Sequence, residues 1–122
     1  VVTGSRGDMK LTEAVVGHSK GNAVSVAGKT DLKSLISLIR GARLVVSNDS
    51  GPMHIAAGLR VPVIAIFGPA NPVRTGPYGT IHKVIRRNMS CSPCYKRTCK
   101  SPDCLEEIRV KDVASAVIDA LN

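Results

Sequence analysis

One stretch decides how this chain folds, and it runs from Val45 to Leu59: VVSNDSGPMHIAAGL. Its start is a short β-branched apolar run, which favours a buried parallel strand. Pro52 and the Ala-rich residues after it suit the first turns of a helix. The residues 48–51 between them all suit a cap or a tight turn, so the helix is expected to begin there with free backbone N–H groups. The stretch therefore predicts a strand, a turn and a helix.

The turn between this strand and this helix suits an anion. The helix dipole favours negative charge at its N-terminus by roughly 0.3 to 1 kcal/mol, and free N–H groups add hydrogen bonds, so a phosphate fits there. Asp49 would repel that phosphate unless its carboxylate instead accepts hydrogen bonds from sugar hydroxyls beside it. The alternative is that Asp49 and Ser50 only cap the helix and that His54 packs against the sheet. From these residues alone both interpretations stay open.

Three blocks of the sequence together resemble the C-terminal domain of glycosyltransferase family 9, whose best-known members are the ADP-heptose:lipopolysaccharide heptosyltransferases. The blocks are NDSGPMHIAA at 48–57, VPVIAIFGP at 61–69 and TGPYG at 75–79. They stand in the family's order and spacing, and the resemblance extends over nearly the whole chain. Each block alone would be weak, but the series is specific. It makes a capping role alone the less favoured interpretation of Asp49.

The resemblance implies the donor-binding half of a GT-B glycosyltransferase that moves heptose from ADP-heptose to the lipopolysaccharide inner core. It implies a Rossmann-like, doubly wound parallel sheet, with residues 1–122 forming a single nucleotide-sugar-binding domain. Asp49 would be catalytic because it holds the donor sugar, and no metal would be required for transfer. The implied donor-binding residues are Asp8, Thr30, Asp49, Ser50, Gly51, Met53 and His54. The general base would lie in an N-terminal acceptor domain, and a family lysine near the phosphates would lie just upstream of Val1.

The same resemblance gives these residues separate roles. Backbone N–H groups at Ser50, Gly51 and Met53 would stabilise the departing diphosphate. Asp8 would bind the ribose hydroxyls, although an N-terminal helix cap is an equal alternative and Asp is shorter than the Glu that many members have there. Thr30 would border the adenine. The residue after it, Asp31, is expected to be the N-cap of the next helix.

Alternating strands and helices independently predict a parallel α/β sheet. The expected strands lie at 1–4, 23–28, 44–46, 61–67 and 82–86, and the expected helices at 9–16, 32–40, from 52 onward, and 110–121. Since 1–4 suits a strand's end, the sequence is expected to begin partway through a fold. The loop 68–79 is too rich in Gly and Pro to suggest a helix. Its Arg74 or Thr75 could reach a phosphate or the acceptor, and a rigid structural loop is the alternative.

Charge and size limit the classes of partner. The 122 residues suffice for one domain with its own core, and no apolar run is long enough to span a bilayer. The net charge is +8, and no acidic residue occurs between Asp49 and Asp103, whereas eight Lys or Arg residues do. Such a bias suits nucleotide phosphates, an anionic membrane or nucleic acid, although a solvated basic face is the commonest cause. Only three aromatic residues are available for stacking, which weakens the case for single-stranded nucleic acid.

With the resemblance, the expected partners are an ADP-sugar donor and a lipopolysaccharide core acceptor, without nucleic acid. The protein is expected to be a cytoplasmic monomer with peripheral contact to the inner face of the inner membrane. One alternative is a zinc-stabilised, basic nucleic-acid-binding domain. Another is a family member that uses a different nucleotide sugar.

A Cys-rich insertion is expected at 88–105. It contains one C-x-x-C followed by two four-residue gaps, formed by Cys91, Cys94, Cys99 and Cys104. The pattern is compatible with a structural zinc site, but the gaps are short and lack the usual long spacer. Two disulfides are the rival interpretation, and free thiols are the third. The sequence leaves all three open.

Overall fold

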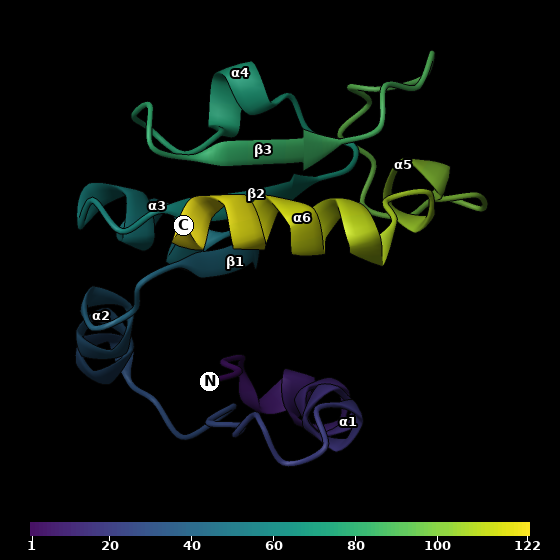
Figure 1. The fold of residues 1–122 in the computed structure, drawn as a ribbon. Coiled ribbons are helices and arrows are strands. Elements are labelled where there is room, and N and C mark those ends of the chain that lie inside the picture. Colours follow the sequence, from purple (N-terminus) through teal and green to yellow (C-terminus); the bar gives the residue numbers. More distant parts are fainter. The chain divides into compact units, whose positions relative to one another are not determined.

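The structure is a computed structural model that describes all of residues 1–122 (Figure 1). These residues form two compact units. The first unit is Val1–Ser37 and the second is Leu38–Asn122. The boundary falls within α2 (Leu32–Arg40). The expectation of one nucleotide-sugar-binding domain over the whole chain stays a prediction.

The first unit pairs two segments in parallel and follows them with helix. Val2 and Ser25 form an isolated parallel bridge, and the Gly28 N–H donates to the Gly4 carbonyl at 2.9 Å. A 3₁₀ turn, η1 (Arg6–Asp8), leads into α1 (Met9–His18). The strands expected at 1–4 and 23–28 are therefore reduced to one bridge. The unit buries only Thr12 and Ala27 almost completely, so little core favours longer pairing.

The second unit contains a three-stranded parallel sheet in the order β1-β2-β3 (Figure 1). Its strands are β1 (Val45–Asn48), β2 (Val63–Phe67) and β3 (Lys83–Arg86). In the register, Asn48 lies beside Ile66, and Phe67 lies beside Arg86. Because the strands are parallel, all three carboxyl ends meet at one edge, where ligands bind in open α/β sheets.

The core of this unit is built around β2. Val63, Ala65 and Phe67 are fully buried, because the central strand of a parallel sheet is covered on both faces. The helix α3 (Gly51–Gly58) packs on β1 and β2 and buries Met53, Ala56 and Ala57. The expectation of a parallel α/β fold is confirmed.

The C-terminal helix α6 (Val110–Leu121) packs on β2 and β3, and it lies across the sheet face that is nearer the viewer in Figure 1. Its one fully buried residue is Ala116. Val113 and Val117 are half-buried, whereas Ala114 and Leu121 are exposed. A small side chain at the contact lets the helix axis come close to the sheet, which turns the buried face toward Ala116.

Two short helices were not expected. The loop 68–79 contains α4 (Pro72–Thr75), so the prediction of a loop without helix is wrong. The side chain of Asn71 caps this turn by accepting a hydrogen bond from the Val73 N–H at 3.0 Å. Proline at the first helical position adds a preset backbone angle. The other short helix is α5 (Asp103–Glu106), at the end of the Cys-rich segment.

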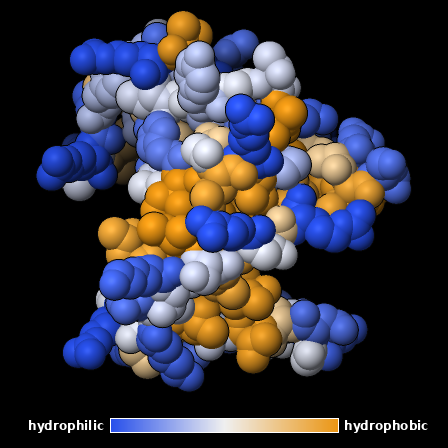
Figure 2. All heavy atoms as spheres, turned by 90° about the vertical axis from the view of Figure 1, so that its left-hand side faces the viewer, coloured by the Kyte–Doolittle hydropathy of each residue, from blue (hydrophilic) through white to orange (hydrophobic).

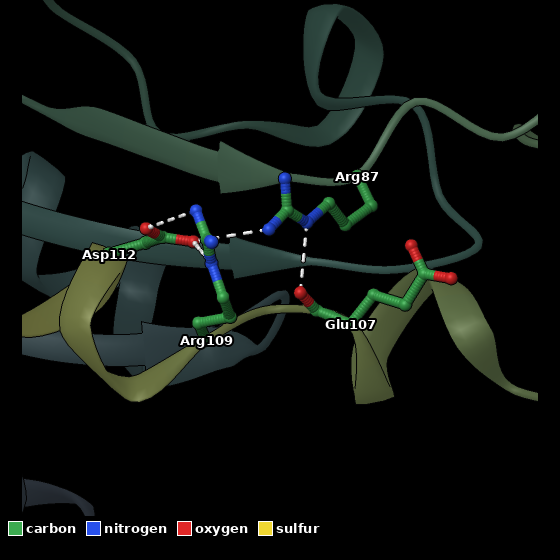
Figure 3. Close-up of polar contacts among 4 residues, drawn as sticks. All are labelled: Arg87, Glu107, Arg109 and Asp112. Atoms are coloured by element: carbon green, nitrogen blue, oxygen red, sulfur yellow. Dashed lines mark hydrogen bonds and ion pairs between the residues drawn. The ribbon is translucent and has the colours of Figure 1, made fainter.

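Arginine side chains connect the end of β3 to α6 (Figure 3). Arg87 donates to the Glu107 carbonyl at 2.9 Å and contacts an Asp112 carboxylate oxygen at 3.3 Å. Arg109 donates to both oxygens of the same carboxylate, at 3.1 and 3.2 Å. Hydrogen bonds from Arg109, and to a lesser degree the charges of both arginines, hold the pKa of Asp112 below its ordinary value.

On the face drawn in Figure 2, apolar side chains reach the surface and hydrophilic side chains surround them. Exposed apolar residues of the second unit include Val46 and Ile118. None of the helices combines the length and the apolar character that crossing a membrane requires.

Candidate functional site

Three loops leave the carboxyl edge of the sheet in the second unit. They follow β1 at Asn48, β2 at Phe67 and β3 at Arg86. Hydrogen bonds between residues far apart in the sequence link the first loop to the second and the second loop to the third. The edge is therefore a connected site and not three independent turns.

The first loop holds Asp49, whose side chain is exposed. The next residue, Ser50, is the N-cap of α3 and has an extended backbone. Its hydroxyl does not cap the helix but lies 3.1 Å from the Ser47 hydroxyl and 3.2 Å from the Asn48 carbonyl. The N–H groups of Ser50 and Gly51 donate to no backbone acceptor. They are free donors at a helix N-terminus, next to a carboxylate.

Two other expected donor-binding residues lie further along α3. Met53 has a fully buried side chain, and its N–H already donates to the Ser50 carbonyl at 3.1 Å. That N–H is therefore engaged in the helix's first turn, and Gly51 and Ser50 are left as the free donors. His54 is exposed. The alternative in which His54 packs against the sheet is wrong.

The second loop reaches Asp49 through α4. The Thr75 hydroxyl donates to Asp49 Oδ2 at 3.2 Å, across 26 positions of sequence. Arg74, which the sequence also suggested for a phosphate or the acceptor, is exposed beside it. The loop therefore contacts Asp49 directly through Thr75. Sequence reasoning named Thr75 but did not find its contact with Asp49.

The third loop, which carries the Cys-rich segment, is attached to the beginning of the second. The Ser92 hydroxyl donates to the Gly68 carbonyl at 3.2 Å. The N–H groups of Cys94 and Tyr95 both donate to the Pro69 carbonyl, at 2.9 and 3.0 Å. The segment therefore supports the loop that carries Thr75.

The other residues that the sequence suggested for donor binding, Asp8 and Thr30, lie in the first unit. Asp8 Oδ2 accepts hydrogen bonds from the Ser5 N–H at 2.8 Å and from the Ser5 hydroxyl at 2.6 Å, and these bonds lower the pKa of Asp8. The carboxylate thus forms a capping box with Ser5 at the start of η1, as the capping alternative expected of it, and it makes no side-chain cap of α1. Thr30 is partly buried. Asp31 Oδ1 accepts from the Ser34 N–H at 2.8 Å, which confirms its role at the N-terminus of α2. Hydrogen bonds from the Ser34 side chain and then from its backbone lower the pKa of Asp31.

All four cysteines are free thiols in the structure. Burial, followed by the charges of the other three cysteines, raises the pKa of Cys104. No three His, Cys, Asp or Glu side chains are arranged to hold a metal ion. The structure therefore shows neither the two disulfides nor the tetrahedral ligand set, and a zinc site formed by these residues stays an alternative that metal analysis tests.

Known proteins match this chain along most of its length. Residues 1–105 match the sequence model of "Glycosyltransferase family 9 (heptosyltransferase)". The chain belongs to glycosyltransferase family 9. It is 34% identical to the lipooligosaccharide heptosyltransferase 2 of Campylobacter jejuni over 92 residues, which are 73% of this chain and 29% of that protein. It is 35% identical to the lipopolysaccharide heptosyltransferase 1 of Pseudomonas aeruginosa, over 73% of this chain and 25% of that protein.

Solved structures of glycosyltransferase family 9 superpose on this chain. A family 9 glycosyltransferase from Veillonella parvula superposes with a TM-score of 0.81 at 28% identity, over 98% of this chain and 35% of that one. The ADP-heptose lipopolysaccharide heptosyltransferase II of Escherichia coli gives 0.80 with the same identity and coverage. The expected GT-B fold is confirmed by these neighbours, and none of these relatives is named as a nucleic-acid-binding protein. The chain spans about a third of the length of the solved structures that it matches.

Proposed function

We propose that this chain is the donor-binding half of a glycosyltransferase that moves heptose from ADP-heptose to the lipopolysaccharide inner core. The observation that carries the proposal is the turn after β1, where the exposed Asp49 adjoins the free N–H groups of Ser50 and Gly51. The similar proteins named above are heptosyltransferases, and the solved relative from Escherichia coli is an ADP-heptose heptosyltransferase by name. A family member that uses another nucleotide sugar is the alternative.

In this proposal, two kinds of group in the turn after β1 bind different parts of the donor. The free N–H groups and the dipole of α3 bind the diphosphate and stabilise the charge that it gains as the bond to the sugar breaks. Asp49 accepts hydrogen bonds from sugar hydroxyls and so fixes the orientation of the reacting carbon. Exposed at the first turn of α3, His54 contributes a further donor. Met53 contributes packing, since its N–H is already engaged.

The nucleoside half of the donor is assigned to the first unit. Asp8 lies shortly after Gly4 in the sequence, and Thr30 lies shortly after Gly28. The segment that contains Gly4 and the segment that contains Gly28 are hydrogen-bonded to each other in parallel. The two residues therefore follow the same ends of a pair of neighbouring segments. We assign the ribose hydroxyls to Asp8, whose Oδ1 is not used by Ser5, and the adenine to the neighbourhood of Thr30.

The remaining parts of the reaction belong outside these residues. The acceptor oxygen forms the new bond to the sugar carbon, and its proton passes to a base on the acceptor side. We propose that transfer requires no metal, because the diphosphate charge is met by N–H groups of α3 and basic residues. The complete enzyme would act as a monomer in the cytoplasm, and its basic residues would contact the inner membrane, where a lipid-linked acceptor is available.

Substitution of Asp49 tests this assignment in an enzyme that joins this chain to an acceptor domain. Asp49→Ala should remove most of kcat/KM without loss of folded structure, because the side chain is exposed. Asp119→Ala is a matched control, since Asp119 is exposed and makes only a surface pair with Lys83 at 3.6 Å. Near-normal kcat/KM in Asp49→Ala would refute the role of Asp49.

A further inference from the structure

The contact between Thr75 and Asp49 is the direct polar bond between the second loop and the candidate sugar site. An ionised carboxylate only accepts hydrogen bonds, so the Thr75 hydroxyl is the donor. Its single proton has two acceptors within reach, Asp49 Oδ2 at 3.2 Å and the Asn71 carbonyl at 3.3 Å. The carboxylate is charged, and bonds to charged acceptors are stronger, so the proton favours Asp49.

The local structure holds Thr75 in place for this bond. Thr75 is the last residue of α4, a single turn that the Asn71 side chain caps at its start. The turn is closed by the Gly76 N–H, which donates to the Pro72 carbonyl at 2.8 Å. A Cβ at position 76 would clash with that same oxygen, so only glycine fits after Thr75 in this geometry. These contacts fix the backbone that presents the hydroxyl.

We propose that Thr75 is a positioning residue that orients the Asp49 carboxylate toward the donor sugar. The inference rests on the proposed function, because it takes Asp49 as the group that binds sugar hydroxyls. Since Thr75 occupies Oδ2, the other oxygen, Oδ1, is left to accept from the sugar. A fixed carboxylate loses less freedom when the sugar binds, which strengthens the bond that it makes. The effect is confined to the sugar and does not extend to the diphosphate.

Donor binding by the full chain tests this separation. Calorimetry would compare ADP-heptose with ADP for the wild type, Thr75→Val, Thr75→Ser and Asp49→Ala. Thr75→Val keeps the shape but removes the hydroxyl, whereas Thr75→Ser keeps the hydroxyl. We expect Thr75→Val to weaken ADP-heptose binding by about three- to tenfold, the effect of a typical net hydrogen bond, because the exposed site reduces the advantage of the charged acceptor. ADP binding should stay unchanged, and Thr75→Ser should bind both ligands like the wild type.

The controls separate positioning from folding. Asn71→Ala removes the cap of α4 but leaves the Thr75 hydroxyl, and Thr75→Ala serves as a second hydroxyl-free variant if valine disturbs the turn. Equal weakening of ADP and ADP-heptose in both hydroxyl-free variants would mean a structural role and would overturn the inference. Unchanged ADP-heptose binding in Thr75→Val would also overturn it. If Asp49→Ala loses its preference for ADP-heptose while Thr75→Val keeps it, only the inference fails. If the wild type does not prefer ADP-heptose to ADP, the proposed sugar site itself fails.

Discussion

Gly68, the first residue after β2, has no room for a side chain because Leu105 of α5 lies against it. A Cβ at Gly68 would come within 2.6 Å of Leu105 Cγ and 2.8 Å of Cδ2. Carbon atoms in ordinary contact are about 3.5 Å apart or more, so Leu105 would have to withdraw by roughly 0.9 Å. The backbone angle at Gly68 is an ordinary one for any residue, so Gly68→Ala tests this contact alone.

The stability that Gly68→Ala should cost depends on how freely the Leu105 side chain can move away. Overpacking costs about 1–3 kcal/mol, and Leu105 is 45% exposed, so the cost should lie near 1 kcal/mol. For a chain of this size that lowers Tm by roughly 3–6 °C. Leu105→Ala alone should cost about 1–2 kcal/mol, because roughly half of the side chain is buried.

A double-mutant cycle isolates the contact. Once Leu105 is alanine, Gly68→Ala should cost nothing further, which gives a coupling of about 1 kcal/mol in urea unfolding followed by circular dichroism. Gly58→Ala is the matched control, because a Cβ there meets nothing within 4 Å. It should be neutral or slightly stabilising in α3. If the costs of Gly68→Ala and Leu105→Ala instead add within about 0.5 kcal/mol in the double variant, the packing of α5 against the loop after β2 is refuted.

Two further predictions concern the thiols and the carboxylates. Under reducing conditions, all four thiols should react with a maleimide reagent without the addition of a chelator. Cys91 and Cys99 should react first because they are exposed. Cys104 should react last because its thiol is partly buried and has a raised pKa. Protection of all four thiols that a chelator removes, together with one equivalent of zinc by elemental analysis, would instead establish a metal site. The pKa of Asp112 is lowered in the folded state, so its contribution to stability is complete above the unfolded pKa of about 3.9 and is lost as the pH falls through the lower, folded value. Asp112→Asn should therefore flatten the loss of stability between about pH 4 and pH 2, and an unchanged acid profile would contradict the arginine contacts of Figure 3.

The sequence predicted the elements that have strong local signals. The buried strand at 61–67, the helix beginning after Ser50 and the helix at 110–121 each follow from an apolar run, a cap or a periodic pattern. The short helix α4 was missed because glycine and proline on both sides hid its start. Asn71 before Pro72 is an N-cap followed by a favoured first residue, and that pair was the signal for it.

What could not be predicted depends on tertiary contacts. The hydrogen bond from Thr75 to Asp49 joins residues 26 positions apart, and no local pattern encodes it. The engagement of the Met53 N–H depends on where the first turn of α3 closes, which local sequence determines only to within a residue or two. The burial of Ala116, in place of larger apolar residues of the same helix, depends on which face of α6 packs on β2 and β3.

Binding of ADP by this chain, measured by calorimetry, tests the donor-site assignment most directly. The turn after β1 offers free N–H groups at the start of α3 beside the exposed Asp49, so we predict weak, saturable binding of ADP that ADP-heptose competes for. The affinity should be poor without an acceptor domain to close the site, and a transfer assay on the chain alone should give no product, because none of the assigned residues is a base for the acceptor hydroxyl. Transfer by this chain alone would show that the base has been misplaced. Absence of binding at millimolar ADP would contradict the assignment of this chain as a donor-binding half.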